Sequence, residues 1–221
     1  NDLIISIREL LKQQQQFTMR AGGTSIGGQA IGEGVIVDIS KHLTNIIDFC
    51  KNKKEIVVEP GIIQDDLNLF LKPYNLKFAP DTSTSNRAMI GGMIGNNSCG
   101  SYSIFYGTTR DHVKSIEVIL SDGGLVEFKE LTTKELDDKL SMQTLEGDIY
   151  RFVINLLNNN QQEILNAFPD ESLIRRNTGY ALDELIHKYK PFNKNGKRFN
   201  LASLICGSEG TLGVIVSATL N

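Results

Sequence analysis

Short apolar runs alternate along the chain with longer amphipathic stretches. The β-branched content of the short runs predicts strands at residues 17–20, 35–39, 55–59, 112–120, 125–130 and 214–220. Apolar positions three and four residues apart predict helices at residues 3–16, 62–71, 133–140 and 148–165. The first helix has an apolar face that needs a packing partner upstream or alongside it. This alternation predicts an α+β fold.

Turn residues separate several of these elements. Asp122 and Gly123 lie between two predicted strands, and an Asp-Gly pair supplies the positive φ that a tight hairpin requires. Residues 188–200 are polar, contain Pro191 and Gly196, and carry several lysines. This composition predicts an exposed excursion between packed elements and not a domain linker.

Composition narrows the class of protein. The chain has 221 residues, of which 40% are hydrophobic, and this is enough for one substantial core or two small lobes. The formal net charge of −3 gives no field that would attract nucleic acid or an anionic membrane. No apolar stretch is long enough for a transmembrane segment, and no signal-peptide pattern is present, so we expect a cytoplasmic protein.

The three cysteines do not have the spacing of a metal site. Cys50, Cys99 and Cys206 lie far apart, without a Cys-x-x-Cys pair or clustered histidines. We therefore expect reduced thiols and no metal bound by this segment.

The first of three glycine-rich segments lies between two predicted strands. Its sequence, RAGGTSIGGQA at residues 20–30, can turn main-chain N–H groups inward and admit a diphosphate without Cβ atoms in the way. A flexible turn is the alternative. Gly28 and Gln29 stand where a P-loop needs Lys and Ser/Thr, and residues 32–34 lack the third glycine of a dinucleotide fingerprint. A nucleoside triphosphatase and a Rossmann domain are both disfavoured.

The second and third segments extend this pattern. Hydroxyl-rich residues 79–85 precede the glycine-rich block 89–100, which leads to Tyr106-Gly107 and could offer amides to an anion. Close helix packing through small residues is the alternative. Residues 206–215 form a compact turn before the last strand and lack the Gly-x-Ser-x-Gly of a nucleophile elbow. Three such segments favour one long ligand contacted at many main-chain points.

Together, these segments resemble the FAD domain of the vanillyl-alcohol oxidase / p-cresol methylhydroxylase (PCMH) type. They are similar to its branch of D-lactate dehydrogenases, D-2-hydroxyglutarate dehydrogenases and glycolate oxidase FAD subunits. The resemblance runs in order through residues 20–25, 90–107, 118–123 and 207–213. Residues 175–185 further resemble large bacterial enzymes that fuse this domain to a substrate cap and an iron–sulfur region.

The resemblance implies a division of the chain and a set of roles. It implies a first α+β subdomain at residues 1–80, truncated at its N-terminus, and a second at residues 81–221. Residues 22–29 would wrap the FAD pyrophosphate, and Thr24 and Ser25 would donate hydroxyl hydrogen bonds. The full set of expected cofactor-binding residues is Arg20, Gly22, Gly23, Thr24, Ser25, Ile26, Gly27, Gly28, Gln29, Pro80, Asp81, Thr82, Ser83, Gly91, Gly92, Gly95, Asn96, Asn97, Gly100, Tyr106, Gly107, Glu209, Gly210, Gly213, Val214 and Ile215.

Within this set, the resemblance assigns regions of the cofactor. Residues 80–83 and 91–100 would line the flavin and ribityl side, and residues 209–215 would close near the adenosine. Asn177 and Thr178 would lie on the substrate side. Covalent relatives carry a histidine where this chain has Thr24, so the resemblance implies noncovalent FAD. Cys99 is expected to be a small packed residue.

The resemblance also implies a reaction. A small 2-hydroxy acid, of the D-lactate, D-2-hydroxyglutarate or glycolate type, would lose a hydride to flavin N5, and electrons would pass to a quinone, a flavoprotein or an iron–sulfur centre. No motif supports His42, His112 or His187 as the base, so the catalytic residues are expected in the cap, outside this chain. An iron–sulfur cluster would likewise lie outside it.

Other interpretations stay open at this point. The same fold serves an NADPH-dependent reductase, and a noncatalytic FAD-holding subunit would have the same glycine-rich segments. A phosphate- or nucleotide-binding module without flavin is a third class. The resemblance places the protein in the cytoplasm or at the periphery of the inner membrane.

Overall fold

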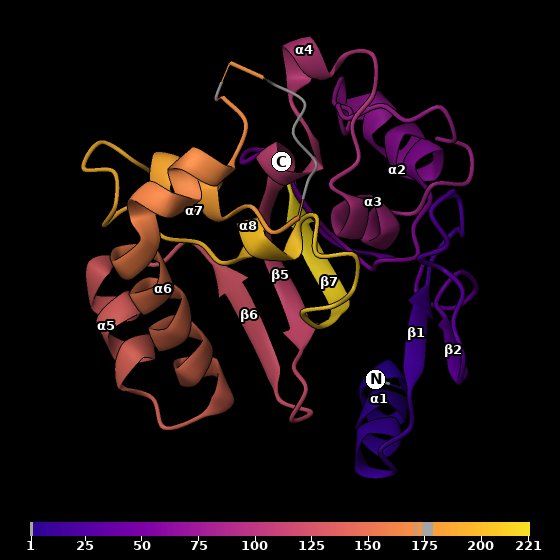
Figure 1. The fold of residues 1–221 in the computed structure, drawn as a ribbon. Coiled ribbons are helices and arrows are strands. Elements are labelled where there is room, and N and C mark those ends of the chain that lie inside the picture. Colours follow the sequence, from indigo (N-terminus) through magenta and orange to yellow (C-terminus); the bar gives the residue numbers. More distant parts are fainter. Residues whose placement is uncertain (1, 171, 174–178) are drawn as a thin grey trace.

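The computed structural model describes residues 2–170, 172–173 and 179–221. It contains two sheets (Figure 1). The smaller sheet pairs β1 (Phe17–Arg20) with β2 (Val35–Asp38) in parallel. The larger sheet is antiparallel throughout and has the order β3 (Ile46–Cys50), β4 (Glu55–Val58), β7 (Val214–Leu220), β5 (Val113–Ile119) and β6 (Leu125–Lys129). Together with the helices, this is the α+β architecture that the sequence predicts.

The β1–β2 pair places the first glycine-rich segment. Parallel strands need a long crossover connection, which is most often a helix. Here the crossover is residues 21–34, which contain no helix or strand. The pairing Phe17–Val35 through Arg20–Asp38 therefore fixes both ends of a glycine-rich loop beside the larger sheet.

The predicted hairpin is confirmed. β5 and β6 pair antiparallel, and Gly123 adopts φ +79° in the connecting turn. The Gly123 N–H donates to the Leu120 carbonyl at 2.9 Å, and the Leu120 N–H donates to the Gly124 carbonyl at 2.8 Å. The turn is closed by main-chain hydrogen bonds on both sides.

Figure 1 shows helices beside β6 at the left, above β1 and β2 at the upper right, and at the lower end of β1. Their bounds are α1 (Asp2–Lys12), α2 (Gln64–Leu71), α3 (Ile90–Asn96), α4 (Ser103–Tyr106), α5 (Thr133–Ser141), α6 (Leu145–Ala167), α7 (Leu182–Lys188) and α8 (Ala202–Ile205), with 3₁₀ turns at Lys72–Tyr74 and Thr109–His112. α6 buries Tyr150, Val153 and Leu157, which helical spacing places on one face. This face joins the main core with Phe128 of β6.

The apolar face of α1 packs against residues of β5, β7 and the segment after β2. Leu3 and Ile7 form a second, smaller core with Ile39, Ile119 and Val214. α1, which precedes β1 of the smaller sheet, therefore packs against the end of β5 and the start of β7. The helix ends at Lys12 and not at residue 16, because Gln14 adopts φ +53° and the Gln15 N–H turns back to the Leu10 carbonyl.

Other elements differ from prediction for local reasons. β3 was not predicted, because none of its residues is fully buried and its apolar pattern is interrupted by Asp48. α2 begins two residues later than expected, because Ile63 is extended and forms a bridge with Met89. α6 begins earlier, where Thr144 caps the helix by accepting a hydrogen bond from the Gly147 N–H. α7 and α8 were also not predicted as helices.

The larger sheet runs across the expected subdomain boundary at residue 80. β3 and β4 precede that residue, but β4 pairs with β7 near the C-terminus through Ile56–Leu220 and Val58–Ala218. The main core likewise joins Ile56 with Ile116. The antiparallel sheet therefore makes residues 46–58 part of the same layer as β5–β7.

The polar residues 188–200 form a closed excursion. The Lys190 N–H donates to the Lys197 carbonyl, and the Lys197 N–H donates back to the Lys188 carbonyl, at 2.9 and 2.8 Å. Most of the turn is exposed, and the chain re-enters the core at Phe199 and Asn200. None of the helices in the described ranges has both the length and the apolar character needed to cross a membrane.

Candidate functional site

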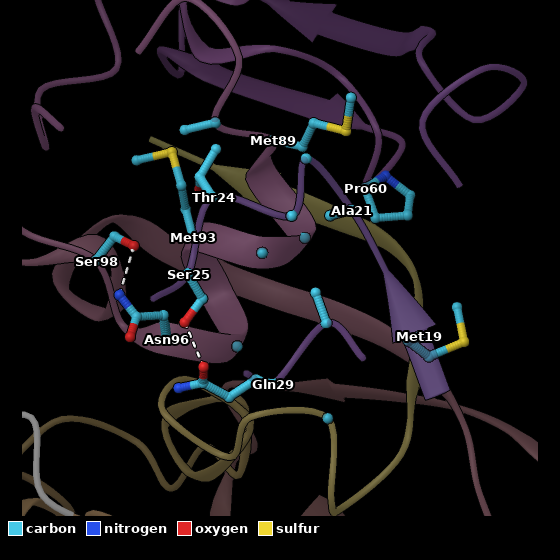
Figure 2. Close-up of a pocket in the computed structure, with 18 of the residues that line it drawn as sticks. Met19, Ala21, Thr24, Ser25, Gln29, Pro60, Met89, Met93, Asn96 and Ser98 are labelled. Atoms are coloured by element: carbon cyan, nitrogen blue, oxygen red, sulfur yellow. Dashed lines mark hydrogen bonds between the residues drawn. The ribbon is translucent and has the colours of Figure 1, made fainter. Parts of the chain in front are cut away.

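A pocket of about 320 Å³ opens between the β1–β2 connection, α3 and the turn before β7 (Figure 2). Each of the three glycine-rich segments supplies part of its lining, which is the arrangement expected for one long ligand. The lining residues are Met19, Ala21, Gly22, Gly23, Thr24, Ser25, Gln29, Ala30, Ile39, Pro60, Thr82, Ser83, Thr84, Ala88, Met89, Gly91, Gly92, Met93, Gly95, Asn96, Ser98, Cys99, Glu209, Gly210, Gly213 and Ile215.

Residues 21–30 form one side of the pocket, the loop wall. A Cβ at Gly22 would lie 2.3 Å from the Arg87 carbonyl oxygen, so the close approach of these two segments requires glycine. Gly23 adopts φ +61°, a conformation that glycine enters at little cost. The Ser25 hydroxyl donates to the Gln29 Oε1 (Figure 2). The Gly27 N–H donates to the Ser25 hydroxyl at 3.4 Å.

The loop wall offers free main-chain donors. Among the described residues, the N–H groups of Gly22, Gly23 and Thr24 have no hydrogen-bond acceptor in the protein. Successive unpaired N–H groups in a turn conformation form a concave anion-binding surface. This is the chemistry that a phosphate group requires.

α3 and the residues after it form the helix wall, residues 91–99. A Cβ at Gly91 would lie 2.6 Å from the Pro60 Cβ, which explains how α3 packs directly on Pro60. A Cβ at Gly92 would lie 3.4 Å from the Ala21 Cβ, so α3 also meets the loop wall at van der Waals distance. Asn96 Nδ2 donates to the Ser98 hydroxyl at 3.0 Å at the end of the helix (Figure 2).

Residues 209–215 form the turn wall, which is attached to the end of α3. The Gly207 N–H donates to the Ile94 carbonyl and the Glu209 N–H donates to the Gly95 carbonyl, both at 2.9 Å. A Cβ at Gly95 would lie 3.9 Å from the Glu209 Cα and the Gly210 nitrogen, which is an ordinary van der Waals distance. The turn wall and the helix wall therefore approach each other closely.

Arg110 stabilises the contact between the turn wall and the helix wall. Its guanidinium donates to the carbonyls of Ser203 and Cys206, at 3.0 and 2.5 Å. Its main-chain N–H donates to the side-chain oxygen of Asn97, which is 0% exposed and follows α3 with φ +49°. Hydrogen bonds from a charged donor are stronger than neutral ones. Arg110 thus connects the segment before the turn wall to the end of the helix wall.

The charge inside the pocket is low. No Lys, Arg or His lines it among the described residues, and Glu209 is its only carboxylate. Partial burial raises the pKa of the Glu209 carboxyl above its ordinary value. The Arg20 guanidinium lies at the rim, 3.1 Å from where a Gly23 Cβ would be. A diphosphate would therefore be held chiefly by main-chain N–H groups and hydroxyls.

The geometry fits FAD. The pocket combines unpaired amides for a diphosphate with hydroxyl, amide and methionine side chains for the less polar parts of a long ligand. Gly22 and Gly91 let the loop wall pack against Arg87 and the helix wall pack against Pro60. In the described residues, no group of three His, Cys, Asp or Glu side chains is placed to hold a metal ion.

Fifteen of the predicted cofactor residues line the pocket, and the others lie elsewhere. Those in the lining are Gly22, Gly23, Thr24, Ser25, Gln29, Thr82, Ser83, Gly91, Gly92, Gly95, Asn96, Glu209, Gly210, Gly213 and Ile215. Those outside it are Arg20, Ile26, Gly27, Gly28, Pro80, Asp81, Asn97, Gly100, Tyr106, Gly107 and Val214. Asn177 and Thr178 lie outside the described residues. The cofactor contacts of all these residues stay a prediction.

Several of the residues outside the lining have structural partners. The Pro80 carbonyl accepts from Gln64, the Asp81 carboxylate accepts from the Tyr102 N–H at 3.1 Å, and Val214 is buried beneath α1. Gly107 adopts φ +77° at the end of α4, where a Cβ would meet Asp111. These interactions shape the neighbouring turns.

The sequence pattern missed a set of small and apolar lining residues, including Met19, Ile39 and Pro60. Such residues carry no distinctive motif, because the same types fill ordinary cores. Cys99, which was expected to be a small packed residue, is half-buried and lines the pocket. Cys50 and Cys206 have free thiols.

Comparisons with known proteins agree with this geometry. The family model described as "FAD binding domain" matches residues 1–129, more than half of the chain. D-2-hydroxyglutarate dehydrogenase of Escherichia coli (strain K12) is 38% identical over 205 residues, which are 93% of this chain and 19% of that protein. A mitochondrial D-lactate dehydrogenase [cytochrome] of Saccharomyces cerevisiae is 34% identical over 118 residues, 52% of this chain and 20% of that protein.

A solved structure shares the fold. Alkyldihydroxyacetonephosphate synthase superposes with a TM-score of 0.62 at 15% identity, covering 99% of this chain and 31% of that one. The chain spans about one fifth of the length of the dehydrogenases that it matches. The match over residues 1–129 and the convergence of three glycine-rich segments on one pocket lead to one conclusion: this chain belongs to the FAD binding domain family.

Proposed function

We propose that this chain is the FAD-binding part of a flavin-dependent dehydrogenase that oxidises a 2-hydroxy acid. The observation that carries the proposal is the pocket whose three glycine-rich walls leave unpaired amides at Gly22, Gly23 and Thr24. Relatives that match more than nine tenths of this chain, including that of Pantoea ananatis at 37% identity, are D-2-hydroxyglutarate dehydrogenases. D-2-Hydroxyglutarate, D-lactate and glycolate are the substrates to test first.

The residues of this chain would bind and orient the cofactor. Bound flavin accepts a hydride at N5, and the protein supplies position and charge for that chemistry. The loop wall would hold the diphosphate, the turn wall would close over the cofactor, and Arg20 would add positive charge at the rim. A noncovalent cofactor is consistent with Thr24 at the place where covalent relatives carry histidine.

The proton-accepting base is proposed to come from outside this chain. A base must reach the substrate hydroxyl within hydrogen-bond distance, and no histidine lines the pocket among the described residues. His112, for example, contacts the carbonyls of Tyr106 and Asn221, at 2.7 and 3.1 Å. The electron acceptor, a quinone, a flavoprotein or an iron–sulfur centre, is left to experiment. We place the protein in the cytoplasm or at the periphery of the inner membrane.

Anaerobic reduction of the flavin in the naturally produced protein tests the proposal. The protein is mixed with D- and L-2-hydroxyglutarate, D- and L-lactate, glycolate, NADPH and, as a matched control without the hydroxyl, glutarate. Bleaching of the flavin by a 2-hydroxy acid and not by glutarate is expected. Bleaching by NADPH alone would identify a reductase of the same fold. A yellow protein that no donor bleaches would be a noncatalytic FAD carrier, and failure to bind FAD would reject the proposal altogether.

A further inference from the structure

Gln64, at the start of α2, is a buried polar residue outside the pocket lining. Its side chain is only 2% exposed, and α2 packs it behind the turn that carries Thr82 and Ser83. Its main-chain N–H donates to the Ala88 carbonyl at 2.9 Å. Buried amides of this kind are almost always fully hydrogen-bonded, so their partners reveal their orientation.

The orientation of the Gln64 amide is fixed by its first partner. The side-chain Nε2 donates to the Pro80 carbonyl oxygen. A carbonyl oxygen can only accept, so the atom that faces it must be the nitrogen. The side-chain Oε1 therefore faces the second partner, the Thr82 hydroxyl, at 3.0 Å.

This orientation fixes the direction of the second hydrogen bond. A threonine hydroxyl has one proton and two acceptor lone pairs, whereas an amide oxygen can only accept. Thr82 must therefore donate its proton to Gln64, since leaving the buried Oε1 without a donor would be unfavourable. Thr82 lines the pocket, and its hydroxyl proton is already donated to Gln64.

Ser25 on the loop wall is a useful contrast. Its hydroxyl also contacts a glutamine amide, that of Gln29, but both residues are exposed. No carbonyl fixes the orientation of the Gln29 amide among the interactions of the described residues, so this pair can reverse its polarity. The Gln64–Thr82 pair cannot reverse without unpairing a buried group.

We propose that Gln64 is a specificity-determining positioning residue, which holds the Thr82 hydroxyl as a hydrogen-bond acceptor toward the pocket. The inference rests on the proposed binding of FAD. It adds which kind of chemical group of the cofactor contacts Thr82. An ionised phosphate offers only acceptors, so it is disfavoured at Thr82. The group that lies there is an O–H or N–H donor, from either the flavin–ribityl half or the adenosine half of the cofactor.

Substitutions at Thr82 test the acceptor. In the naturally produced protein stripped of flavin, Thr82→Val removes the hydroxyl with little change of shape and is expected to weaken FAD binding about 5- to 10-fold, the value of one hydrogen bond. Thr82→Ser retains the hydroxyl and is the matched control, with affinity within about 2-fold of wild type. Dissociation constants come from titration followed by flavin fluorescence. An unchanged affinity in Thr82→Val would overturn the proposal.

Competing probes test the polarity and locate the donor. Inorganic pyrophosphate should compete with FAD equally well in wild type and Thr82→Val, because Thr82 does not meet a phosphate. Weaker competition by pyrophosphate in the variant would overturn the proposal. ADP then separates the two halves of the cofactor. Weaker binding of FAD alone assigns the donor to the flavin–ribityl half, and equal weakening of FAD and ADP assigns it to the adenosine half.

A double-mutant cycle tests the role of Gln64. Gln64→Met should weaken FAD binding when Thr82 is present and have no further effect in the Thr82→Val background, because Gln64 acts through that hydroxyl. Equal effects in both backgrounds would show that Gln64 supports only the fold, and would overturn the proposal that it acts through the Thr82 hydroxyl. If Gln64→Met does not fold, the Thr82 variants and pyrophosphate still decide the polarity. Failure of the wild type to bind FAD would instead reject the proposed function.

Discussion

The loop wall and the helix wall line one pocket but are held in place by different means. The loop wall is largely exposed, and its internal side-chain contacts are short-range ones between Ser25, Gly27 and Gln29. The helix wall rests on Pro60 and is tied to the segment before the turn wall by main-chain hydrogen bonds and by Arg110. One side is preorganised by packing, whereas the other keeps free donors.

This difference separates stability from binding. Groups that satisfy each other inside the protein stabilise the fold but are not available to a ligand. The unpaired N–H groups of the loop wall do the opposite, because they are solvated until a ligand arrives. Substitutions in the helix wall should therefore reduce stability, and substitutions in the loop wall should reduce chiefly cofactor affinity.

The largest effect is expected at Gly91. In Gly91→Ala, the added Cβ would lie 2.6 Å from the Pro60 Cβ and 3.0 Å from the Pro60 carbonyl oxygen. Overpacking of this kind costs about 1–3 kcal/mol, or roughly 2–12 °C in Tm for a chain of this size. Gly92→Ala is the matched control in the same helix, since its Cβ would lie 3.4 Å from the Ala21 Cβ. Thermal unfolding without FAD measures both, and equal Tm values would contradict a rigid helix wall.

An intermediate effect, on binding alone, is expected at Ser25. Ser25→Ala removes an exposed hydroxyl that pairs with Gln29, so its effect on stability should stay within about 0.5 kcal/mol. Loss of one hydrogen bond to the cofactor or to its ordering loop should weaken FAD binding about 3- to 10-fold. Calorimetric titration with FAD measures the affinity, and Ser25→Thr serves as the hydroxyl-retaining control. A fall in Tm without loss of FAD affinity would show that the loop wall contributes to stability and not to binding, contrary to the expected difference between the two walls.

The smallest effect is expected at Glu209 and depends on pH. Burial raises the pKa of its carboxyl above the ordinary value of 4.5, so the folded protein holds this proton more tightly than the unfolded chain. Stability therefore declines as pH rises from the unfolded-state pKa through the folded-state pKa, and the loss is complete above both. Glu209→Gln should raise the Tm slightly at about pH 8 and leave it unchanged at about pH 4. A difference that persists at low pH would argue against titration as its cause.

The glycine spacing was sufficient to predict three segments that line the pocket, because glycine reports a backbone requirement wherever it lies. Positive φ at Gly23 and Gly210 is a property of the local chain. β5, β6 and β7 were predicted for a similar reason, since β-branched runs and an Asp-Gly turn specify strands locally. The partly buried strand β3 carried no such pattern.

The convergence of these segments was decided by tertiary structure. The pairing of β4 with β7 brings residues 55–58 beside residues 214–220, and no local pattern in either strand encodes its partner. Pro60, Met89 and Met93 line the pocket only because the sheet and α3 place them there. The sequence by itself determined where the chain can turn and expose its amides. Packing and long-range hydrogen bonds, such as those of Arg110 and Gln64, determined which turns meet and which way their donors face.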